Sequence, residues 1–410
     1  MKRSIKLAVV AALALGATSA FATNGTSLIG YGAKSRGMGG TGVAHFQGAE
    51  SGFNNPALLS NAVGTEVSIG GTYFAPTVSN ELNAGFGPAA GTYDSTASAS
   101  LIPAVSMATK VNDSFAWGLA LYGVGGMGTD YRDDIVGGQS NGTPGTGLGG
   151  SGLPAANDNL LLMRFSAPFA YNISGFSVGV APVIEYGALA QNDMFGTPGI
   201  TTDIAFGFEI GAAYDFKAVG VEGLSVGLDY KSAVEHDFKN SFASAAPGST
   251  SVQSKLDTPS ILVAGVSYSI SGNTISFDYK NIGYADATGL KDFDWENQSV
   301  YALGYEYAAD GWAARLGYNY GASPLPEVSS TFDNANQVVG SLLAFPAVTE
   351  SHFTVGGTYD FSETTSLDAA FVYGTGSQTS TDVNPVGPGD QIITATNDQI
   401  SATVAVNFNF

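Results

Sequence analysis

The histidines are the first candidates for chemistry, and their spacing predicts none. His45, His236 and His352 lie far apart, and none has a neighbour at a metal-ligand spacing. The chain holds no cysteine, which excludes disulfides and thiolate metal sites. It also shows no nucleophile elbow at a predicted strand-to-helix turn and no phosphate-binding loop. We therefore expect no catalytic residue, no metal and no cofactor, and hence no enzyme.

Four basic residues are instead suited to binding an anion. Arg164, Arg315, Lys280 and Lys231 alternate with apolar neighbours, which sets each on the polar face of a predicted strand. A carboxylate head group needs such a cation or several hydrogen-bond donors, and Arg164 and Arg315 are the preferred candidates. The alternative is that these cations pair with carboxylates on the same faces and only support the interior. Those carboxylates are Glu185, Glu209, Asp229, Asp278, Glu306 and Asp368.

The elements that carry these residues are predicted strands with a period of two. From Ile400 to Phe410, apolar residues at every second position alternate with small or polar ones. Residues 204–216 repeat the pattern with larger aromatic side chains. A soluble sandwich shows this alternation with its apolar face inward. A membrane barrel shows it with the apolar face toward lipid and the polar face lining the lumen.

Composition favours the membrane barrel. Hydrophobic residues make up 44% of the chain and charged residues only 12%, whereas about a quarter of the residues in ordinary soluble domains are charged. Every apolar run beyond the N-terminal region is interrupted within a few residues, so no membrane-spanning helix is expected. Because only helices and closed barrels satisfy the backbone inside lipid, we predict an all-β, antiparallel transmembrane barrel.

Residues 1–22 are typical of a secretory signal peptide. Lys2, Arg3 and Lys6 precede a short apolar stretch, and Ala20-Phe21-Ala22 supplies the small residues needed for cleavage. The apolar stretch is too short to span a bilayer as a helix, so we expect the mature chain to begin near Thr23. Loss of the three cations takes the formal charge from −20 to −23, and such acidity argues against nucleic-acid partners.

About fourteen predicted strands follow, joined by connections that alternate between long and short. The strands are 64–76, 98–111, 114–125, 159–172, 175–187, 203–216, 222–232, 258–270, 273–284, 297–308, 311–321, 350–361, 365–375 and 398–410. Short turns at one end and long loops at the other are the signature of outer-membrane barrels, and an even strand number places both ends in the periplasm. We assign the barrel to residues 63–410.

Residues 23–62 do not follow the barrel pattern. The segment is rich in glycine, shows little alternation and precedes the first predicted strand. We expect it to form a plug, or hatch, inside the lumen. An ordinary open porin has no such segment, so this stretch discriminates a plugged barrel from a general porin.

Two stretches resemble a known family. Ser35-Arg36-Gly37-Met38-Gly39-Gly40-Thr41-Gly42-Val43-Ala44 is followed by Glu50-Ser51-Gly52-Phe53-Asn54-Asn55-Pro56-Ala57-Leu58, whose most characteristic part is Asn55, Pro56 and Ala57. This resembles the N-terminal hatch of the FadL/TodX/OmpP1 family of outer-membrane hydrophobic-compound transporters. Val111-Asn112-Asp113-Ser114-Phe115-Ala116-Trp117-Gly118 is similar to the family's turn into the third strand.

The resemblance implies a monomeric fourteen-stranded barrel that takes up long-chain fatty acids or aromatic hydrocarbons passively. It also implies a kinked third strand that opens a lateral exit into the membrane. Gly123, Gly125 and Gly126 are our candidates for that kink, because glycines inside a strand mark bulges or bends. The alternative is a plain strand end that runs into a glycine-rich loop.

The expected function is therefore binding of hydrophobic small molecules in a plugged barrel and their lateral release. The expected surroundings are the lipid and lipopolysaccharide of the cell outer membrane of a Gram-negative bacterium. A general porin, or a surface adhesin or receptor whose loops carry the function, is the alternative. Which hydrophobic compound is carried stays open at this stage.

Overall fold

A computed structural model describes residues 24–97, 99–131, 157–191, 200–239, 254–329, 342–343, 345–382 and 390–410. The predicted signal peptide lies outside the described residues. No helix in the described part of the chain is long and apolar enough to cross a membrane.

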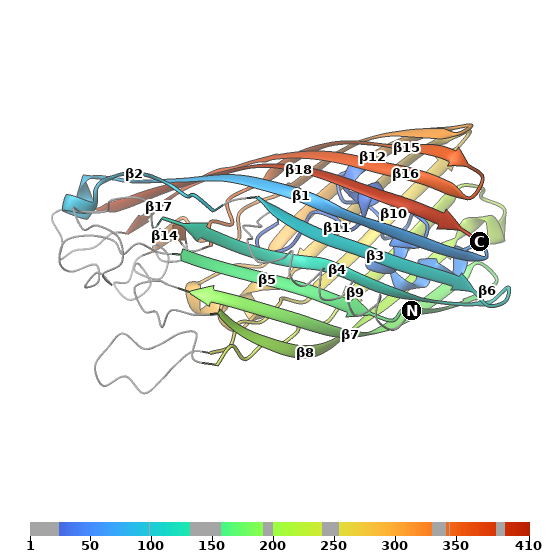
Figure 1. The fold of residues 1–410 in the computed structure, drawn as a ribbon, viewed down its shortest axis with the longest axis horizontal. Coiled ribbons are helices and arrows are strands. Elements are labelled where there is room, and N and C mark those ends of the chain that lie inside the picture. Colours follow the sequence, from blue (N-terminus) through green and yellow to red (C-terminus); the bar gives the residue numbers. More distant parts are fainter. Residues whose placement is uncertain are drawn as a thin grey trace.

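The described strands form one sheet that closes on itself as a barrel, and all its pairings are antiparallel except the short one between Val328–Ser329 and Thr381–Asp382 (Figure 1). The strands are β1 (Thr65–Leu82), β2 (Gly91–Asp94), β3 (Ser100–Lys110), β4 (Phe115–Asp130), β5 (Asn157–Ser166), β6 (Phe169–Ile173), β7 (Phe176–Gln191), β8 (Ile200–Asp215), β9 (Leu224–Lys231), β10 (Ile261–Ile270), β11 (Asn273–Ile282), β12 (Gln298–Ala309), β13 (Trp312–Gly321), β14 (Val328–Ser329), β15 (Ser351–Ser362), β16 (Thr365–Thr375), β17 (Ser377–Asp382) and β18 (Gln391–Asn409).

The wall contains the fourteen strands predicted from the sequence. Three wall strands are each built from two segments, namely β2 with β3, β5 with β6, and β16 with β17, and β14 is a two-residue addition beside β17. Closure comes from β1 and β18, which pair antiparallel from Glu66–Asn409 to Leu82–Ile393. The pairing extends well beyond the predicted ranges 64–76 and 398–410, because polar residues continue the backbone ladder after the apolar alternation has ended.

Side chains alternate across the wall as predicted. On β8, Phe206 and Phe208 are 72% and 48% exposed on the outside, whereas Ala205 and Glu209 are buried on the inside. On β18, Ile400 faces out. Because the outer face is apolar and the inner face polar or small, the wall suits a lipid surround with an occupied lumen.

The two ends of the barrel differ in their connections. Several turns at one end are very short, and Ser174-Gly175 and Ser271-Gly272 adopt positive φ at both central positions, which is the geometry that joins twisted antiparallel strands most tightly. We call this the turn end; the C-terminus lies there (Figure 1). The described parts of the long connections lie at the opposite end, which we call the loop end. In outer-membrane barrels the short turns are periplasmic and the long loops extracellular.

Candidate functional site

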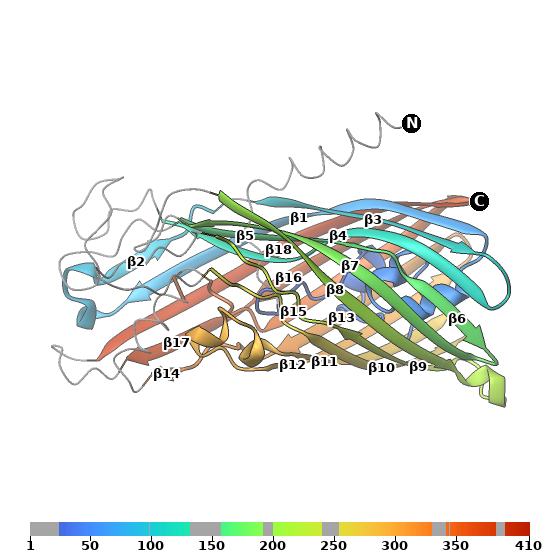
Figure 2. The same ribbon diagram turned by 90° about the horizontal axis from the view of Figure 1, so that it is seen from below.

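The glycine-rich segment between residues 24 and 62 lies inside the barrel (Figures 1 and 2). It contains one helical turn, α2 (Ala33–Gly37), and two 3-10 turns, η1 (Glu50–Phe53) and η2 (Pro56–Asn61). Its hydrogen bonds reach wall strands on several sides of the lumen. They join Arg36 to Ser401 and Thr403 of β18, Gly39 to Thr354 of β15, Gly42 and Val43 to Asp278 of β11, and Asn55 to Ala212 of β8.

Glycines on the inner wall let the hatch backbone approach closely. A Cβ atom added to Gly227 would lie 2.0 Å from the Val43 carbonyl oxygen, and one on Gly317 would lie 2.1 Å from the Gly39 nitrogen. A Cβ atom added to Gly179 would likewise lie 2.3 Å from the Ala57 nitrogen. Any side chain at these positions would displace the hatch, so the wall and the hatch are built as one packed unit.

The Asn55-Pro56-Ala57 triplet forms the turn that docks this unit on β8. The Asn55 Oδ1 atom accepts a hydrogen bond of 3.0 Å from the Ala57 N–H and so caps η2, while Pro56 occupies its first position. The Asn55 Nδ2 donates to the carbonyl oxygens of Val43 and Ala212, at 2.8 and 3.1 Å. The motif therefore has a structural role that joins two parts of the hatch to the wall.

The two predicted head-group arginines are engaged in ion pairs between strands on the lumenal face of the wall. Arg164 donates to the Glu185 Oε2 atom from Nε and Nη2, at 2.9 and 2.6 Å, and both side chains are buried. Arg315 contacts Glu306 at 2.6 Å and Asp368 at 3.6 Å. Both arginines thus satisfy carboxylates of the wall, as in the alternative considered from the sequence.

The two lysines lie at the interface between the hatch and strands β9 and β11. Lys231 contacts Glu209 and lies 2.9 Å from Asp229 and 3.2 Å from the Phe53 carbonyl oxygen. Lys280 donates to the Ile29 carbonyl oxygen.

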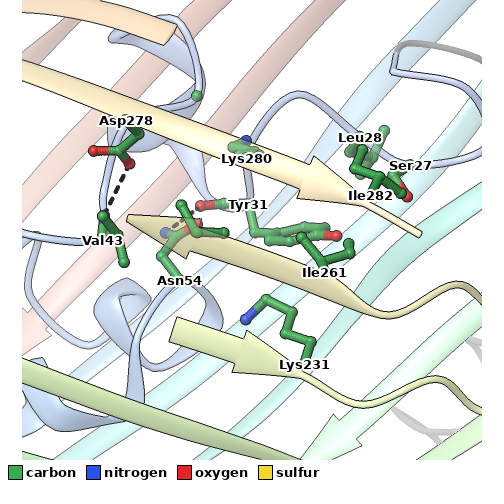
Figure 3. Close-up of a pocket in the computed structure, with 12 residues that line it drawn as sticks. Ser27, Leu28, Tyr31, Val43, Asn54, Lys231, Ile261, Asp278, Lys280 and Ile282 are labelled. Carbon is green, nitrogen blue, oxygen red and sulfur yellow. Dashed lines mark hydrogen bonds between the residues drawn. The ribbon is translucent and has the colours of Figure 1, made fainter. Parts of the chain in front are cut away.

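Both lysines line a cavity of about 20 Å³, which holds about one water molecule. Figure 3 shows Tyr31 extending across this cavity, and neither Arg164 nor Arg315 lines it. The head-group role of the four cations stays a prediction.

The third wall strand, β4, carries an irregularity at its glycines. Its pairing with β5 shifts register between Gly123 and Gly125, as a β-bulge does. Its pairing with β3 runs only from Lys110–Ala116 to Ala104–Tyr122. Beyond Tyr122, the described residues make no further β3–β4 ladder, although β3 continues to pair with β1.

Nearer the loop end, the stretch between β2 and β3 contacts β4. The Thr96 N–H donates to the Asp130 carbonyl oxygen at 2.7 Å. In the part of the chain that the structure describes, the β3–β4 ladder therefore ends at Ala104–Tyr122, and we call the stretch from Tyr122 to Asp130 the β3–β4 seam. Pro103, which has no N–H to donate, is the first residue of β3 beyond the paired stretch, and Ile102 packs against Gly123. A proline within the predicted strand 98–111 was a signal for this interruption that the sequence analysis did not use.

The first described residues of the hatch cover the lumenal side of the seam. Ser27 forms a β-bridge with Gly125, and the Gly126 N–H donates to the Thr26 carbonyl oxygen at 3.0 Å. The start of the hatch thus pairs with β4 along a stretch where the described residues of β3 do not. Tyr284, in the connection after β11, accepts from the Thr26 N–H at 2.8 Å and donates to the Asn24 carbonyl oxygen at 2.7 Å. No sequence pattern pointed to these contacts.

The lumen differs in polarity on the two sides of the hatch. Toward the loop end, buried apolar side chains from the wall, the hatch and the connections form one continuous cluster that includes Phe74, Ile102, Met127, Leu160 and Trp295. Toward the turn end lies an open hollow of about 370 Å³ with a largely polar lining that includes Lys110, Asp113, Asn172, Asp215 and Lys217. An apolar solute therefore meets a favourable environment on one side of the hatch only.

Fold and site together define an outer-membrane β-barrel closed by an internal hatch. A model of the family described as "Outer membrane protein transport protein (OMPP1/FadL/TodX)" matches residues 7–145 and 199–410, and the chain belongs to this family.

The 47 kDa outer membrane protein of Pasteurella multocida (strain Pm70) is 24% identical over 359 residues, which cover 78% of this chain and 79% of that protein. An uncharacterized protein of Chlorobium limicola, encoded in the 5′ region of a phosphoenolpyruvate carboxykinase gene, is 57% identical over 60 residues. That match covers 14% of this chain and only 30% of the relative.

Solved structures share the fold. The toluene transporter TodX of P. putida superimposes with a TM-score of 0.68 at 17% identity, covering 93% of this chain and 99% of that one. A FadL homologue of Pseudomonas aeruginosa gives a TM-score of 0.71 at 14% identity, covering 94% and 100%. The family and the barrel fold together place the protein in the outer membrane of a Gram-negative bacterium.

Proposed function

We propose that the protein takes up hydrophobic compounds passively, by binding them on the loop side of the hatch and releasing them sideways through the β3–β4 seam. The observation that carries the proposal is the interruption of β3–β4 pairing between Tyr122 and Asp130, which borders the apolar cluster of the lumen. The axial route is filled by the hatch, so a lateral route is the shorter way from this cluster into lipid.

Free-energy differences support lateral release. Burying one methylene group is worth about 0.8 kcal/mol, so a molecule with several methylenes leaves an apolar lumen for water reluctantly. Passage toward the turn end would take it past Lys110, Asp113 and Lys217 into a polar hollow. Passage through the seam leads past Ile102 and Gly123 to the lipid-facing side of the wall. Transfer down a concentration gradient needs no further energy source along this path.

The structural relatives support the same class of solute. One is named a toluene transporter and another a FadL homologue, and both have this barrel at low sequence identity. We therefore place the solute of this protein among hydrophobic small molecules, with fatty acids and aromatic hydrocarbons as the two branches. Gly123 and Gly125 are proposed as the residues whose register shift shapes the exit.

An uptake assay paired with conductance tests the proposal. Cells that express the protein in an outer membrane lacking related channels should accumulate radiolabelled toluene or 1-decanol several-fold faster than cells with an empty vector. In planar bilayers the purified protein should show no large, steady conductance. Unchanged uptake of every apolar solute tested would exclude transport, whereas a steady open conductance would support a general porin. If the expressing cells attach to surfaces or bind ligands through the loops but take up no apolar solute, the protein is an adhesin or receptor.

A further inference from the structure

The connections that cover the apolar part of the lumen carry an excess of negative charge. Residues 232–239 and 254–260 lie between β9 and β10, and residues 283–297 join β11 to β12. Together these stretches hold seven carboxylates and three lysines. They fold inward, because Phe238, Leu256 and Trp295 are buried in the apolar cluster of the lumen. A molecule that enters from the loop end therefore passes beneath a negatively charged cover.

In the described part of the lumen beneath this cover, most cations are already paired with carboxylates. The Arg164 guanidinium is held by Glu185, whose other oxygen lies 3.2 Å from His236. Lys231 is shared between Glu209 and Asp229. Across the lumen, Arg315 contacts Glu306 and Asp368, and Lys34 also lies 3.8 Å from Asp368. Each of these cations is already matched or outnumbered by carboxylates.

Two cations, Lys280 and Arg36, need separate treatment. Lys280 donates to the Ile29 carbonyl oxygen and lines a cavity of about 20 Å³, which holds about one water molecule and is too small for a carboxylate head group. Arg36 is the second case. Among the described residues it has no carboxylate partner, and it donates instead to Ser401 at 2.6 Å and Thr403 at 3.0 Å. Its side chain is 1% exposed and is enclosed between the hatch and β18. A ligand could reach it only after the hatch had left the wall. Arg36 therefore stabilises the hatch and is closed to an incoming anion.

We propose that this charge distribution makes the pathway selective for uncharged hydrophobic molecules and closes it to the corresponding carboxylates. The inference rests on the proposed uptake function and specifies its substrate class. A carboxylate inside the lumen would lose its hydration and find no free cation, and it would lie near carboxylates that share too few cations. Desolvation and like-charge repulsion then act together against the anion, whereas a neutral molecule of the same length meets neither.

Two probes of equal chain length, 1-decanol and decanoate, separate the classes. Binding of each radiolabelled probe to the purified full-length protein in neutral detergent is measured at pH 8 and low ionic strength, after subtraction of micelle-only controls. We expect decanoate to bind at least about tenfold more weakly than 1-decanol, because like-charge juxtaposition is costly. Added salt should reduce the difference, since the charges of the exposed connection are screened.

A matched pair of triple variants tests the origin of the selectivity. Asp286→Asn/Asp294→Asn/Glu296→Gln neutralises three exposed carboxylates of the loop-end connection. Glu222→Gln/Asp310→Asn/Glu363→Gln neutralises three exposed carboxylates near the turn end. The first variant should bind decanoate several-fold more tightly and 1-decanol unchanged, and the second should behave as the wild type.

The outcomes keep the inference and the proposed function apart. Equal or tighter binding of decanoate by the wild type, with 1-decanol also bound, would overturn the selectivity while uptake of hydrophobic compounds stands. An equal gain of decanoate binding in both triple variants would overturn the role assigned to the loop-end charges. Binding of neither probe by protein that is folded by circular dichroism would refute the proposed function itself.

Discussion

A reversible cross-link across the β3–β4 seam would test lateral release directly. A Cβ atom built on Gly123 lies 3.7 Å from the Ile102 Cβ, within the range of about 3.5–4.5 Å found in disulfides. The Ile102 Cγ2 atom, which would crowd that Cβ at 2.3 Å, is removed when isoleucine becomes cysteine. The chain has no native cysteine, so Ile102→Cys/Gly123→Cys introduces a single defined pair.

Oxidation of this pair should reduce uptake of toluene or 1-decanol at least about tenfold, and a reductant should restore it. The bond closes a loop of roughly 20 residues, which is worth about 3 kcal/mol of stability in the chain-entropy account. Loss of uptake would therefore not reflect unfolding.

Val105→Cys/Leu121→Cys is the matched control, because these residues already face each other in the paired part of the two strands. Uptake by the oxidised Ile102→Cys/Gly123→Cys protein at the wild-type rate would refute release through the seam.

Three further predictions concern the hatch. Gly227→Val places a side chain where the Val43 carbonyl oxygen lies 2.0 Å from a Cβ, so it should undock the hatch and produce a steady single-channel conductance; a silent bilayer would argue against a packed unit. Asn55→Ala removes the cap of η2 and the hydrogen bond to the Ala212 carbonyl oxygen. It should destabilise hatch docking by about 1–2 kcal/mol. Hydrogen exchange of residues 30–60 should then be faster, and unaltered exchange would contradict this prediction. Burial raises the pKa of Glu50 above its usual value, so the docked hatch holds a proton that the undocked segment releases. Docking should therefore weaken as the pH rises through the window above about 4.5. Glu50→Gln should flatten this pH dependence in thermal melts recorded between pH 4 and 8, and an unchanged slope would exclude Glu50 as its cause.

Close contact between the hatch and the wall restricts which residues each of them can carry at the contact. Gly179, Gly227 and Gly317 are required by the backbone of another segment, not by their own strands. The ion pairs of Arg164 and Arg315 join neighbouring wall strands and offer little net stability over apolar packing, because burial of charges offsets their attraction. Their value lies in engaging Arg164 and Arg315, which an incoming anion could otherwise bind, and the inferred selectivity depends on this neutralisation.

The sequence alone determined the parts of the protein that depend on local periodicity. Residues 203–216 had to form a strand with Phe206 and Phe208 on one face, since side chains in a strand alternate at every residue whatever it pairs with. The alternation of long and short connections then determined the strand number. The Asn55-Pro56-Ala57 triplet pointed to the family because its turn chemistry is also local.

Only the tertiary structure decided which distant groups meet. Arg164 was identified as a lumenal cation, but its neutralisation by Glu185 depends on the register of β5 against β7, which the alternation pattern leaves free by any even shift. The seam beyond Tyr122 and its cover by Thr26 and Ser27 depend on where three separate segments stop pairing. Such contacts are set by closure of the whole barrel around the hatch, a constraint that no single stretch of sequence contains.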